Sequence, residues 1–580
     1  MADLARSTTT LAGQPISSAL ASWRAAARNW DSPPLLLWLL PVAIAVLRMI
    51  PFLWTLAITP PDGQTVLQAS YMPPDVLSYQ AFIRQASETS SILLANPYTL
   101  DPQHGRYILL LHSGLGFLSA ASGVSATWLW ELSRLPLSCL FLLTLWWFLK
   151  PILPARNDRI WACVLVGLSG GVEGIMKLVA DRLPAFFSNH FAQATWHLYG
   201  WNTFEVLANP MWIAGLTLLL VVLKPLLQPD GLRNVLDQVQ VGMGFLLLFY
   251  VHPYSALVVL TVAGALAVAD WIFTRRLQLD KQLPILRALC LPFVVIAIIS
   301  TWQSQDVVYR QTAGNVFGTL QLSVFWYPFT LGFVGVLALR GAQRWTQTQH
   351  PYRFSLLAWI AAVIFMHTSP VLNGYHFVMY LHLPLCILAA PVLRQQLQEV
   401  RGSATPGTRI WKRMVAYGTL LLTFVSFALV TIEATADIRR NNLRPAEYEQ
   451  IISELQALPA GRLLADHELG SIVPTYTSHQ VYVGHWFLSP DFLAKRERYA
   501  KLTSDAQYAP ELARLVAEQQ IDYLLVPRQQ ANWVAERFAD RYSKRITFHS
   551  QTLFALHASS APRQRLVSAS SAPRQQLGTD

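Results

Sequence analysis

The sequence predicts a mostly α-helical, polytopic membrane protein with a small α/β domain near its C-terminus. Of the 580 residues, 53% are hydrophobic and only 13% are charged, whereas soluble globular chains carry about 25% charged residues. Apolar runs of about 20 residues, the length that crosses a bilayer, recur along the first three quarters of the chain. After Glu433 short helix and strand patterns alternate, which is typical of an α/β fold.

We expect about eleven membrane spans within residues 34–432. A further apolar stretch, 107–122, is short, Gly-rich and interrupted by His112, and is interpreted as a juxtamembrane or re-entrant helix. The expected spans are 34–58, 128–149, 160–180, 211–227, 241–250, 254–273, 289–302, 322–339, 354–366, 377–392 and 414–432.

The charge pattern indicates how the chain is oriented. A net charge of +11 could indicate nucleic-acid binding, but the Lys and Arg residues fall mostly in short loops between spans. The positive-inside rule explains this pattern better, so we expect a plasma-membrane protein that binds no nucleic acid. Segment 1–33 is then cytoplasmic, whereas the first polar loop, 59–106, and the domain at 433–558 are extracytoplasmic. The tail, 559–580, repeats Ser-Ser-Ala-Pro-Arg-Gln and is predicted to be disordered.

The loop 59–106 holds the first candidate for chemistry. Loops of this length are usually functional or disordered, and residues 76–86 have the pattern of an amphipathic helix. Asp75 precedes that helix, where it can serve as an N-cap, as a proton acceptor for a hydroxyl group, or as both. Tyr79 lies on the same helix face. Asp62 and Asp101 are weaker candidates because they stand in Pro-flanked turns.

Four cations are expected toward the outer side: Arg106, Lys177, Arg182 and Arg310. If they converge, they suit a phosphate or pyrophosphate group at the membrane surface. The alternative is a surface that faces lipid headgroups. Within the spans, the acid–base pairs could simply neutralise each other; they are Glu131 with Arg134 and Glu173 with Lys177.

His485 is a further candidate, because it follows a predicted strand at 480–484 and loops at strand ends often carry function. The other outer histidines show no metal-site spacing. No cofactor is indicated with certainty, and a divalent cation held by carboxylates is left open. The sequence contains no P-loop, dinucleotide fingerprint or Ser nucleophile elbow. The remaining outer histidines are His104, His190, His197 and His376.

Two short stretches carry a resemblance to a known family. They are the segment 73–79 (Pro-Pro-Asp-Val-Leu-Ser-Tyr) and the segment 481–486 (Val-Tyr-Val-Gly-His-Trp), which is followed by Pro490-Asp491-Phe492 and Lys495. With the first span, the outer loop and the outer domain, this layout resembles the GT-C superfamily of membrane glycosyltransferases, in particular uncharacterised bacterial members.

The resemblance implies transfer of a hexose or pentose from a polyprenyl-phosphate carrier to an extracytoplasmic glycan, lipid or protein. It assigns Asp75 the role of the loop acid, which acts as base or metal ligand. Many members have two acids adjacent or one residue apart in this loop, whereas Asp62 and Asp75 are far apart here. The Trp-Trp-Asp run of oligosaccharyltransferases is missing, since Phe148 follows the Trp pair. Both departures argue against metal use and against protein glycosylation.

The sequence is therefore compatible with two alternative functions. In the first, the chain is an inverting glycosyltransferase in which Asp75 deprotonates the acceptor and outer cations hold the donor phosphate. In the second, it is a non-catalytic membrane protein, either a transporter or a scaffold for polymer or cell-envelope assembly. No inverted repeat is evident, which disfavours a transporter. A cavity that reaches Asp75 from the outer leaflet would favour the enzyme, and a continuous polar path would favour transport.

Overall fold

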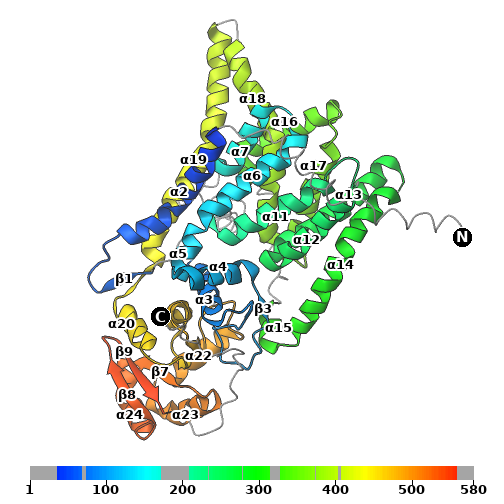
Figure 1. Cartoon of the computed structure of the whole chain (residues 1–580). Helices are drawn as coiled ribbons and strands as arrows, with labels where there is room; N and C mark the ends of the chain where they lie inside the picture. The colour runs from blue at the N-terminus through cyan, green and yellow to red at the C-terminus, as the bar shows by residue number, and fades with distance from the viewer. Residues whose placement is uncertain are drawn as a thin grey trace, which may run out of the picture.

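A helical body and a smaller domain built on a mixed sheet make up the protein (Figure 1). A computed structural model provides the coordinates. It describes residues 35–67, 73–170, 208–232, 234–276, 278–313, 327–372, 374–402 and 406–557.

Five helices of the described residues are long and apolar enough to cross a membrane. They are Trp38–Ala57, Ala126–Ile152, Pro253–Phe273, Leu279–Ser304 and His376–Val400. Shorter apolar helices accompany them, over Pro210–Leu226, Val235–Val251, Arg353–Thr368 and Ala416–Val425. The chain is thus a mostly helical, multi-pass membrane protein, as the sequence predicts, while the count of eleven spans stays a prediction.

The expected apolar runs lie within or overlap the helices of the body, and residues 171–180 of the run at 160–180 lie outside the described residues. The run predicted at 128–149 is split at Ser133, and a buried ion pair between Glu131 and Arg134 bridges the break. The helices are α2 (Leu35–Ala57), α5 (Ala126–Leu132), α6 (Arg134–Ile152), α7 (Arg156–Leu168), α11 (Pro210–Leu226), α12 (Val235–Val251), α13 (Pro253–Thr274), α14 (Leu279–Ser304), α15 (Val307–Ala313), α16 (Tyr327–Gln347), α17 (Arg353–Thr368), η3 (Gly374–Leu381), α18 (His382–Gly402) and α19 (Pro406–Asn441).

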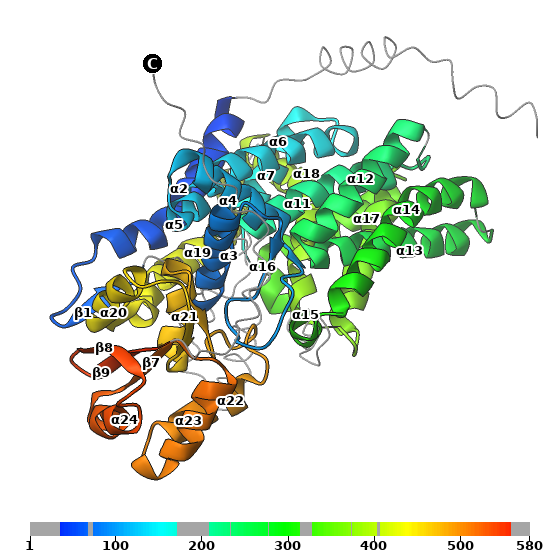
Figure 2. The ribbon, with the colours of Figure 1, turned by 60° about the horizontal axis from the view of Figure 1, so that its bottom comes forward.

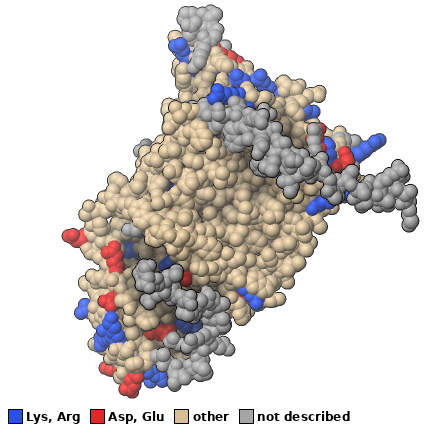
Figure 3. Space-filling view, in the orientation of Figure 1, with Lys and Arg blue, Asp and Glu red and all other residues tan. Residues whose placement is uncertain are grey.

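The surface of the body is apolar where lipid is expected. Figure 3 shows a wide band without acidic or basic residues between the basic end at the top and the domain at the lower left. On α14, Leu286, Leu291 and Ile298 are 63%, 70% and 64% exposed. Large apolar side chains exposed together in this way mark a surface that is covered by another apolar phase, here the bilayer.

The polar loop 59–106 and the stretch 107–122 that follows it, together called the first outer loop, form a short layer at one end of the body. It contains β1 (Gln64–Val66), α3 (Pro73–Thr89), β2 (Leu93–Leu94), β3 (Tyr107–Ile108) and α4 (Leu110–Ser122). Gly116 lets α4 pack closely on α3, because a Cβ atom there would lie 2.5 Å from the Cβ of Ala86. At 13 residues, α4 is about 20 Å long. That is shorter than the hydrocarbon core of a bilayer, which is roughly 30 Å thick.

The C-terminal domain is built on a five-stranded sheet in the order β6-β5-β7-β9-β8. Strand β5 is parallel to β6 and β7, whereas β9 is antiparallel to β7 and β8. Its elements are α20 (Glu447–Gln456), β5 (Arg462–Leu464), α21 (His467–Tyr476), β6 (Gln480–Val481), α22 (Phe492–Leu502), η4 (Ala506–Tyr508), α23 (Ala509–Glu518), β7 (Tyr523–Pro527), η5 (Arg528–Gln530), α24 (Ala531–Arg537), β8 (Tyr542–Thr547) and β9 (Gln551–Leu556).

The domain packs directly on the first outer loop. Helix α21 lies beside α3 (Figure 2), and Thr475 donates a hydrogen bond of 2.9 Å to the carbonyl of Leu77. Strand β1 pairs with β4 (Leu443–Pro445), which directly follows the last body helix, with Thr65 opposite Arg444. Loop and domain also share one buried apolar cluster. The first outer loop and the C-terminal domain are therefore joined.

Candidate functional site

Asp75 lies in the first turn of α3 with its side chain 32% exposed. A carboxylate is favourable there, because the free amide groups at a helix N-terminus carry a partial positive charge. The hydroxyl of Ser78 donates to the backbone carbonyl of Asp75 at 2.8 Å and reinforces the turn. The carboxylate itself is engaged from the C-terminal domain, since its Oδ1 atom lies 3.2 Å from Nε2 of His485. The structure thus brings two of the predicted site residues together.

The hydrogen bonds around His485 define its tautomer. The ring is buried, with 4% of the side chain exposed. Its Nδ1 accepts from the backbone amides of Phe487 and Leu488, at 3.2 Å and 3.3 Å. A ring nitrogen that accepts hydrogen bonds carries no proton, so the ring proton is on Nε2, and this N–H group donates a hydrogen bond to Asp75. The buried ring of His485 thus contacts the carboxylate of Asp75, and its predicted role in substrate binding stays a prediction.

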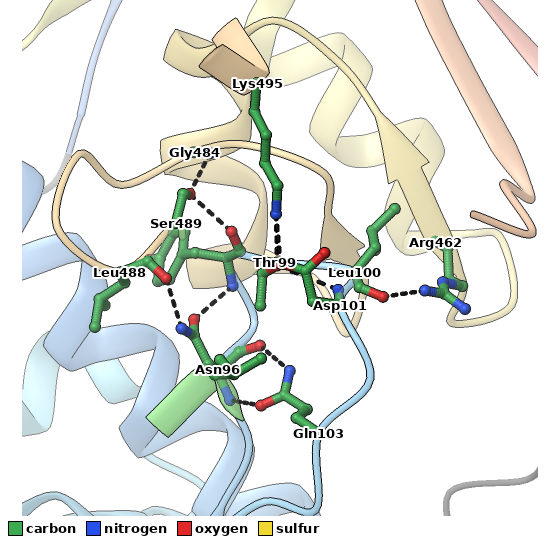
Figure 4. Close-up of polar contacts among 12 residues, drawn as sticks. Asn96, Thr99, Leu100, Asp101, Gln103, Arg462, Gly484, Leu488, Ser489 and Lys495 are labelled. Atoms are coloured by element: carbon green, nitrogen blue, oxygen red, sulfur yellow. Dashed lines mark hydrogen bonds and ion pairs between the residues drawn. The ribbon is translucent and has the colours of Figure 1, made fainter. Parts of the chain in front are cut away.

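The segment that carries His485 is fixed by contacts with the first outer loop (Figure 4). The hydroxyl of Ser489 accepts from the amide of Gly484 at 3.0 Å and donates to the carbonyl of Tyr98 at 2.7 Å. The side-chain amide of Asn96 donates to the carbonyl of Leu488 at 2.6 Å. Buried side chains therefore replace a regular sheet ladder in holding this segment.

A second set of contacts lies further along the same interface (Figure 4). Lys495 of α22 forms an ion pair with Asp101 at 2.5 Å and donates to the hydroxyl of Thr99 at 3.1 Å. Arg462 of β5 donates to the carbonyl of Leu100. Asp101, which the sequence analysis gives as a weaker candidate for chemistry, therefore takes part in a contact that joins the loop to the C-terminal domain.

Close backbone packing fixes the segment from the other side. A Cβ atom on Gly484 would lie 2.4 Å from the carbonyl oxygen of Gly470 and 2.9 Å from the ring of Tyr98. A Cβ atom on Gly470 would lie 2.0 Å from the carbonyl oxygen of Val483. Backbone atoms cannot move aside as a flexible side chain can, so only glycine fits at either position.

Tyr79 lies on α3 as predicted, but its ring contacts the helices beneath. It lies 5.3 Å from the ring of His112 and 5.0 Å from that of Trp130. His112 in turn stacks on Trp130 at 5.7 Å. These rings join α3 to α4 and α5 below Asp75.

Two of the four predicted cations, Arg106 and Arg310, lie among the described residues. Arg106 lies over the ring of Trp302, 4.8 Å from its centroid, and donates to Gln305 at 3.1 Å, so it holds the loop to the end of α14. Arg310 is exposed on α15. Lys177 and Arg182 lie outside the described residues.

The positions of the predicted outer histidines show whether they could contribute to a metal site. Asp75 interacts electrostatically with His376 of η3, and His104 is exposed. His190 and His197 lie outside the described residues. No group of three His, Cys, Asp or Glu side chains that could hold a metal ion occurs within the described ranges.

Sequence reasoning missed the residues that hold the segment around His485. Asn96 and Ser489 both precede proline, a pattern that indicates only a turn. Their partners come from segments nearly 400 residues away, with separations of 392 and 391 residues. No local pattern could have identified these pairings.

The comparisons with known proteins concern the overall fold. No protein-family model matches the chain, and no curated protein sequence matches it. The Archaeoglobus fulgidus oligosaccharyltransferase is 12% identical, with 90% of this chain and 74% of that chain covered and a TM-score of 0.44. ArnT from Cupriavidus metallidurans bound to undecaprenyl phosphate is 15% identical, with 91% and 99% covered and a TM-score of 0.43.

The arabinofuranosyltransferase AftD from Mycobacteria is 16% identical, with 89% of this chain and 40% of that chain covered and a TM-score of 0.45. Identities and TM-scores of this size carry no information about substrate or catalytic residues. Over about 90% of its length, the chain is similar in overall layout to solved GT-C membrane glycosyltransferases, the family that the sequence resembles.

Proposed function

We propose that the protein is an inverting membrane glycosyltransferase whose base is Asp75 and whose donor is a sugar linked to polyprenyl phosphate. The observation that carries this proposal is the contact between Asp75 and His485. A partly exposed carboxylate is oriented by a buried, neutral imidazole at the junction of an apolar helical body and an outer domain. General bases require this combination of access and fixed orientation.

The chemistry assigned to Asp75 is a single displacement. The acceptor hydroxyl gives its proton to the carboxylate while its oxygen attacks the anomeric carbon of the sugar. The bond between that carbon and the phosphate oxygen breaks, and the polyprenyl phosphate leaves with the bonding electron pair. Because His485 engages Oδ1, we assign the proton to Oδ2. His485 is then a positioning residue and Asp75 the catalytic residue.

The leaving phosphate needs positive charge near the membrane surface. Arg310 is the described candidate, because it is exposed on α15, at the outer end of α14. Lys177 and Arg182 are proposed as further partners on the basis of sequence alone. Arg106 is less suited to this role because Trp302 and Gln305 occupy its guanidinium.

The site is proposed to face the extracytoplasmic side of the plasma membrane, with the N-terminus in the cytoplasm. The sequence places its basic loops on the opposite side, and Figure 3 shows basic residues at the end of the body away from the domain. A hollow beside Asp75 that opens to the outer leaflet is part of this proposal.

The experiment compares Asp75→Asn with Asp62→Asn in the full chain, reconstituted in liposomes. The probes are undecaprenyl phosphates carrying radiolabelled hexoses or pentoses, and the acceptors come from a membrane extract. Asn keeps the size of the side chain but cannot take a proton, so Asp75→Asn should abolish transfer at equal expression. Asp62 is exposed in the same loop, and its variant should transfer normally. Full turnover by Asp75→Asn would remove this residue from the role, and no transfer by any form would favour the non-catalytic alternative.

A further inference from the structure

Five aromatic and imidazole rings meet at the ends of helices α11, α12 and α13 and on η3. We call them the ring cluster; its members are Trp212, His252, Tyr254, His376 and Tyr380. The rings of Trp212 and His252 lie 4.0 Å apart, and those of Tyr254 and His376 lie 4.3 Å apart. Trp212 stacks at 6.4 Å on both Tyr254 and His376, and Tyr380 lies 6.3 Å from Trp212. The members come from α11, α13, η3 and the residue between α12 and α13, so tertiary packing creates the cluster.

The ring cluster lies at the end of the body that carries Asp75. Met211, which precedes Trp212, packs against the apolar cluster that the first outer loop shares with the C-terminal domain. Helix α12, which ends directly before His252, contacts α4, and Figure 1 shows α11 and α12 next to α3 and α4.

The base of the ring cluster is a buried polar network. Nδ1 of His252 lies 2.7 Å from the hydroxyl of Ser255, which lies 2.8 Å from that of Tyr380. His252 is 1% exposed, and its Nε2 has no hydrogen-bond partner among the described residues. A buried polar atom of this kind is costly. The cost is removed if a ligand supplies a partner.

Access to the ring cluster differs between its members. Tyr254 and His376 are partly exposed, whereas Trp212, His252 and Tyr380 are buried. The partly exposed pair is therefore the part of the ring cluster that a ligand can reach, and the buried three form the wall behind it. Gly215 contributes to this packing, since a Cβ atom there would lie 2.8 Å from that of His252.

We propose that the ring cluster binds the sugar of the lipid-linked donor, an inference that rests on the proposed function. Ligand sites combine aromatic walls with a few placed polar groups, and a sugar offers both apolar C–H faces and hydroxyl groups. The rings of Tyr254 and His376 face the sugar ring, and imidazole and phenol groups bond its hydroxyls. The phosphate is assigned to another part of the site, because none of the five members is Lys or Arg, the side chains that commonly pair with phosphate.

The test measures binding separately from turnover. The full-length Asp75→Asn protein in nanodiscs is titrated with undecaprenyl phosphate carrying glucose, mannose, galactose or arabinose, and with sugar-free undecaprenyl phosphate. Tyr254→Ala and His376→Ala are then introduced singly. The matched control is Phe354→Ala, which removes one member of the stacked pair Phe273–Phe354, whose rings lie 4.0 Å apart. Phe273 is near the end of α13 opposite to Tyr254, about 30 Å away.

We expect at least one sugar-bearing lipid to bind more tightly than the sugar-free lipid. Each ring-cluster variant should weaken that binding roughly fivefold or more, leave the sugar-free lipid unchanged and melt at the temperature of the control. An equal loss for both lipids, no loss, or no preference for any sugar would overturn the inference. Failure of the proposed function is separate, because it would appear as turnover by Asp75→Asn while sugar binding still depended on the ring cluster.

Discussion

Nε2 of His485 lies 3.2 Å from Oδ1 of Asp75, although 410 residues separate the two in the sequence. The carboxylate belongs to the first outer loop and the imidazole to the C-terminal domain. The candidate site is therefore completed only when the two segments are packed together. Its integrity can be tested by changing residues in the domain as well as those in the loop.

Two substitutions of His485 separate the hydrogen bond of Nε2 from the two that Nδ1 accepts. His485→Gln keeps a donor near the position of Nε2, whereas His485→Asn keeps an acceptor near the position of Nδ1 but is too short to reach Asp75. Loss of orientation at a base costs roughly a hundredfold in rate. We expect kcat to fall by about that factor in His485→Asn with KM little changed, and to fall much less in His485→Gln. Equal activity of the two variants would contradict a positioning role.

The close approach of Gly484 to Gly470 predicts that Gly484→Ala displaces the segment carrying His485. The added Cβ would meet a backbone carbonyl at 2.4 Å, and such overpacking destabilises by about 1–3 kcal/mol. Thermal unfolding in detergent should show the loss, together with reduced transfer. Gly264→Ala is the control, because nothing lies within 4 Å of its added Cβ. If Gly484→Ala were as stable and as active as Gly264→Ala, the close approach of Gly484 to Gly470 would be contradicted.

The ion pair between Lys495 and Asp101 should contribute measurable stability. Its side chains are 11% and 31% exposed, and a partly buried, charge-assisted contact contributes roughly 1–3 kcal/mol. A double-mutant cycle with Lys495→Met and Asp101→Asn, read by thermal unfolding, should give a coupling energy in that range. The matched pair Arg514–Glu518 is 65% and 52% exposed and should give about 0–1 kcal/mol. Equal coupling energies in the two pairs would show that burial does not strengthen the ion pair between Lys495 and Asp101.

His479 should make the C-terminal domain sensitive to acid. The ring donates to the carbonyl of Leu455 at 2.8 Å and accepts from the amide of Gly461 at 3.0 Å, and burial lowers its pKa below the ordinary value of 6.5. A lowered pKa means that the unfolded chain binds the proton first. The stabilising contribution of the neutral ring is therefore complete above about pH 6.5 and is lost as the pH falls through the lower pKa of the folded chain.

Thermal unfolding of the full chain between pH 7.5 and 5 checks this sign. The His479→Gln variant should be less stable at pH 7.5 but should lose less stability on acidification than the native chain. His549 is exposed, so His549→Gln should keep the native slope. A slope unchanged by His479→Gln would assign the acid sensitivity to other groups.

Accessibility from the two sides of the membrane tests the proposed orientation. In a chain whose native cysteines are replaced by serine, Arg514→Cys and Thr348→Cys would provide single exposed thiols in the domain and between α16 and α17. A membrane-impermeant maleimide should label the first in intact cells and the second only after permeabilisation. The reverse pattern would place the domain, and with it Asp75, in the cytoplasm.

Local patterns predicted much of the fold. The expected helix at 76–86 is the central part of α3, and the apolar runs recur within body helices, although α14 (Leu279–Ser304) and α19 (Pro406–Asn441) extend well beyond their predicted runs, 289–302 and 414–432. Helix α21 was missed because Gly470 and Pro474 interrupt its pattern and both residues disfavour helices in isolation. Its packing on α3 overrides that preference. The pairing of β1 with β4 was also missed, because three-residue strands carry too little pattern.

The site was harder to predict than the fold. Asp75 and His485 were each singled out by their place at the end of an element, but their contact depends on tertiary packing. Arg106 illustrates the opposite case: its position in an outer loop suggested a phosphate ligand, whereas it lies over Trp302 and holds the loop to α14. Sequence indicates which residues are chemically competent, and only the packing shows which of them are already engaged.

The pairing of β1 with β4 has a consequence for biosynthesis. The ribosome makes β1 directly after the first body helix and β4 only after the last one. The early strand must therefore wait, exposed and unpaired, while all the intervening helices are inserted. A nascent chain released before this pairing would have its carboxylate but lack the histidine that orients it. Activity would consequently report complete translation and correct insertion of the whole polypeptide.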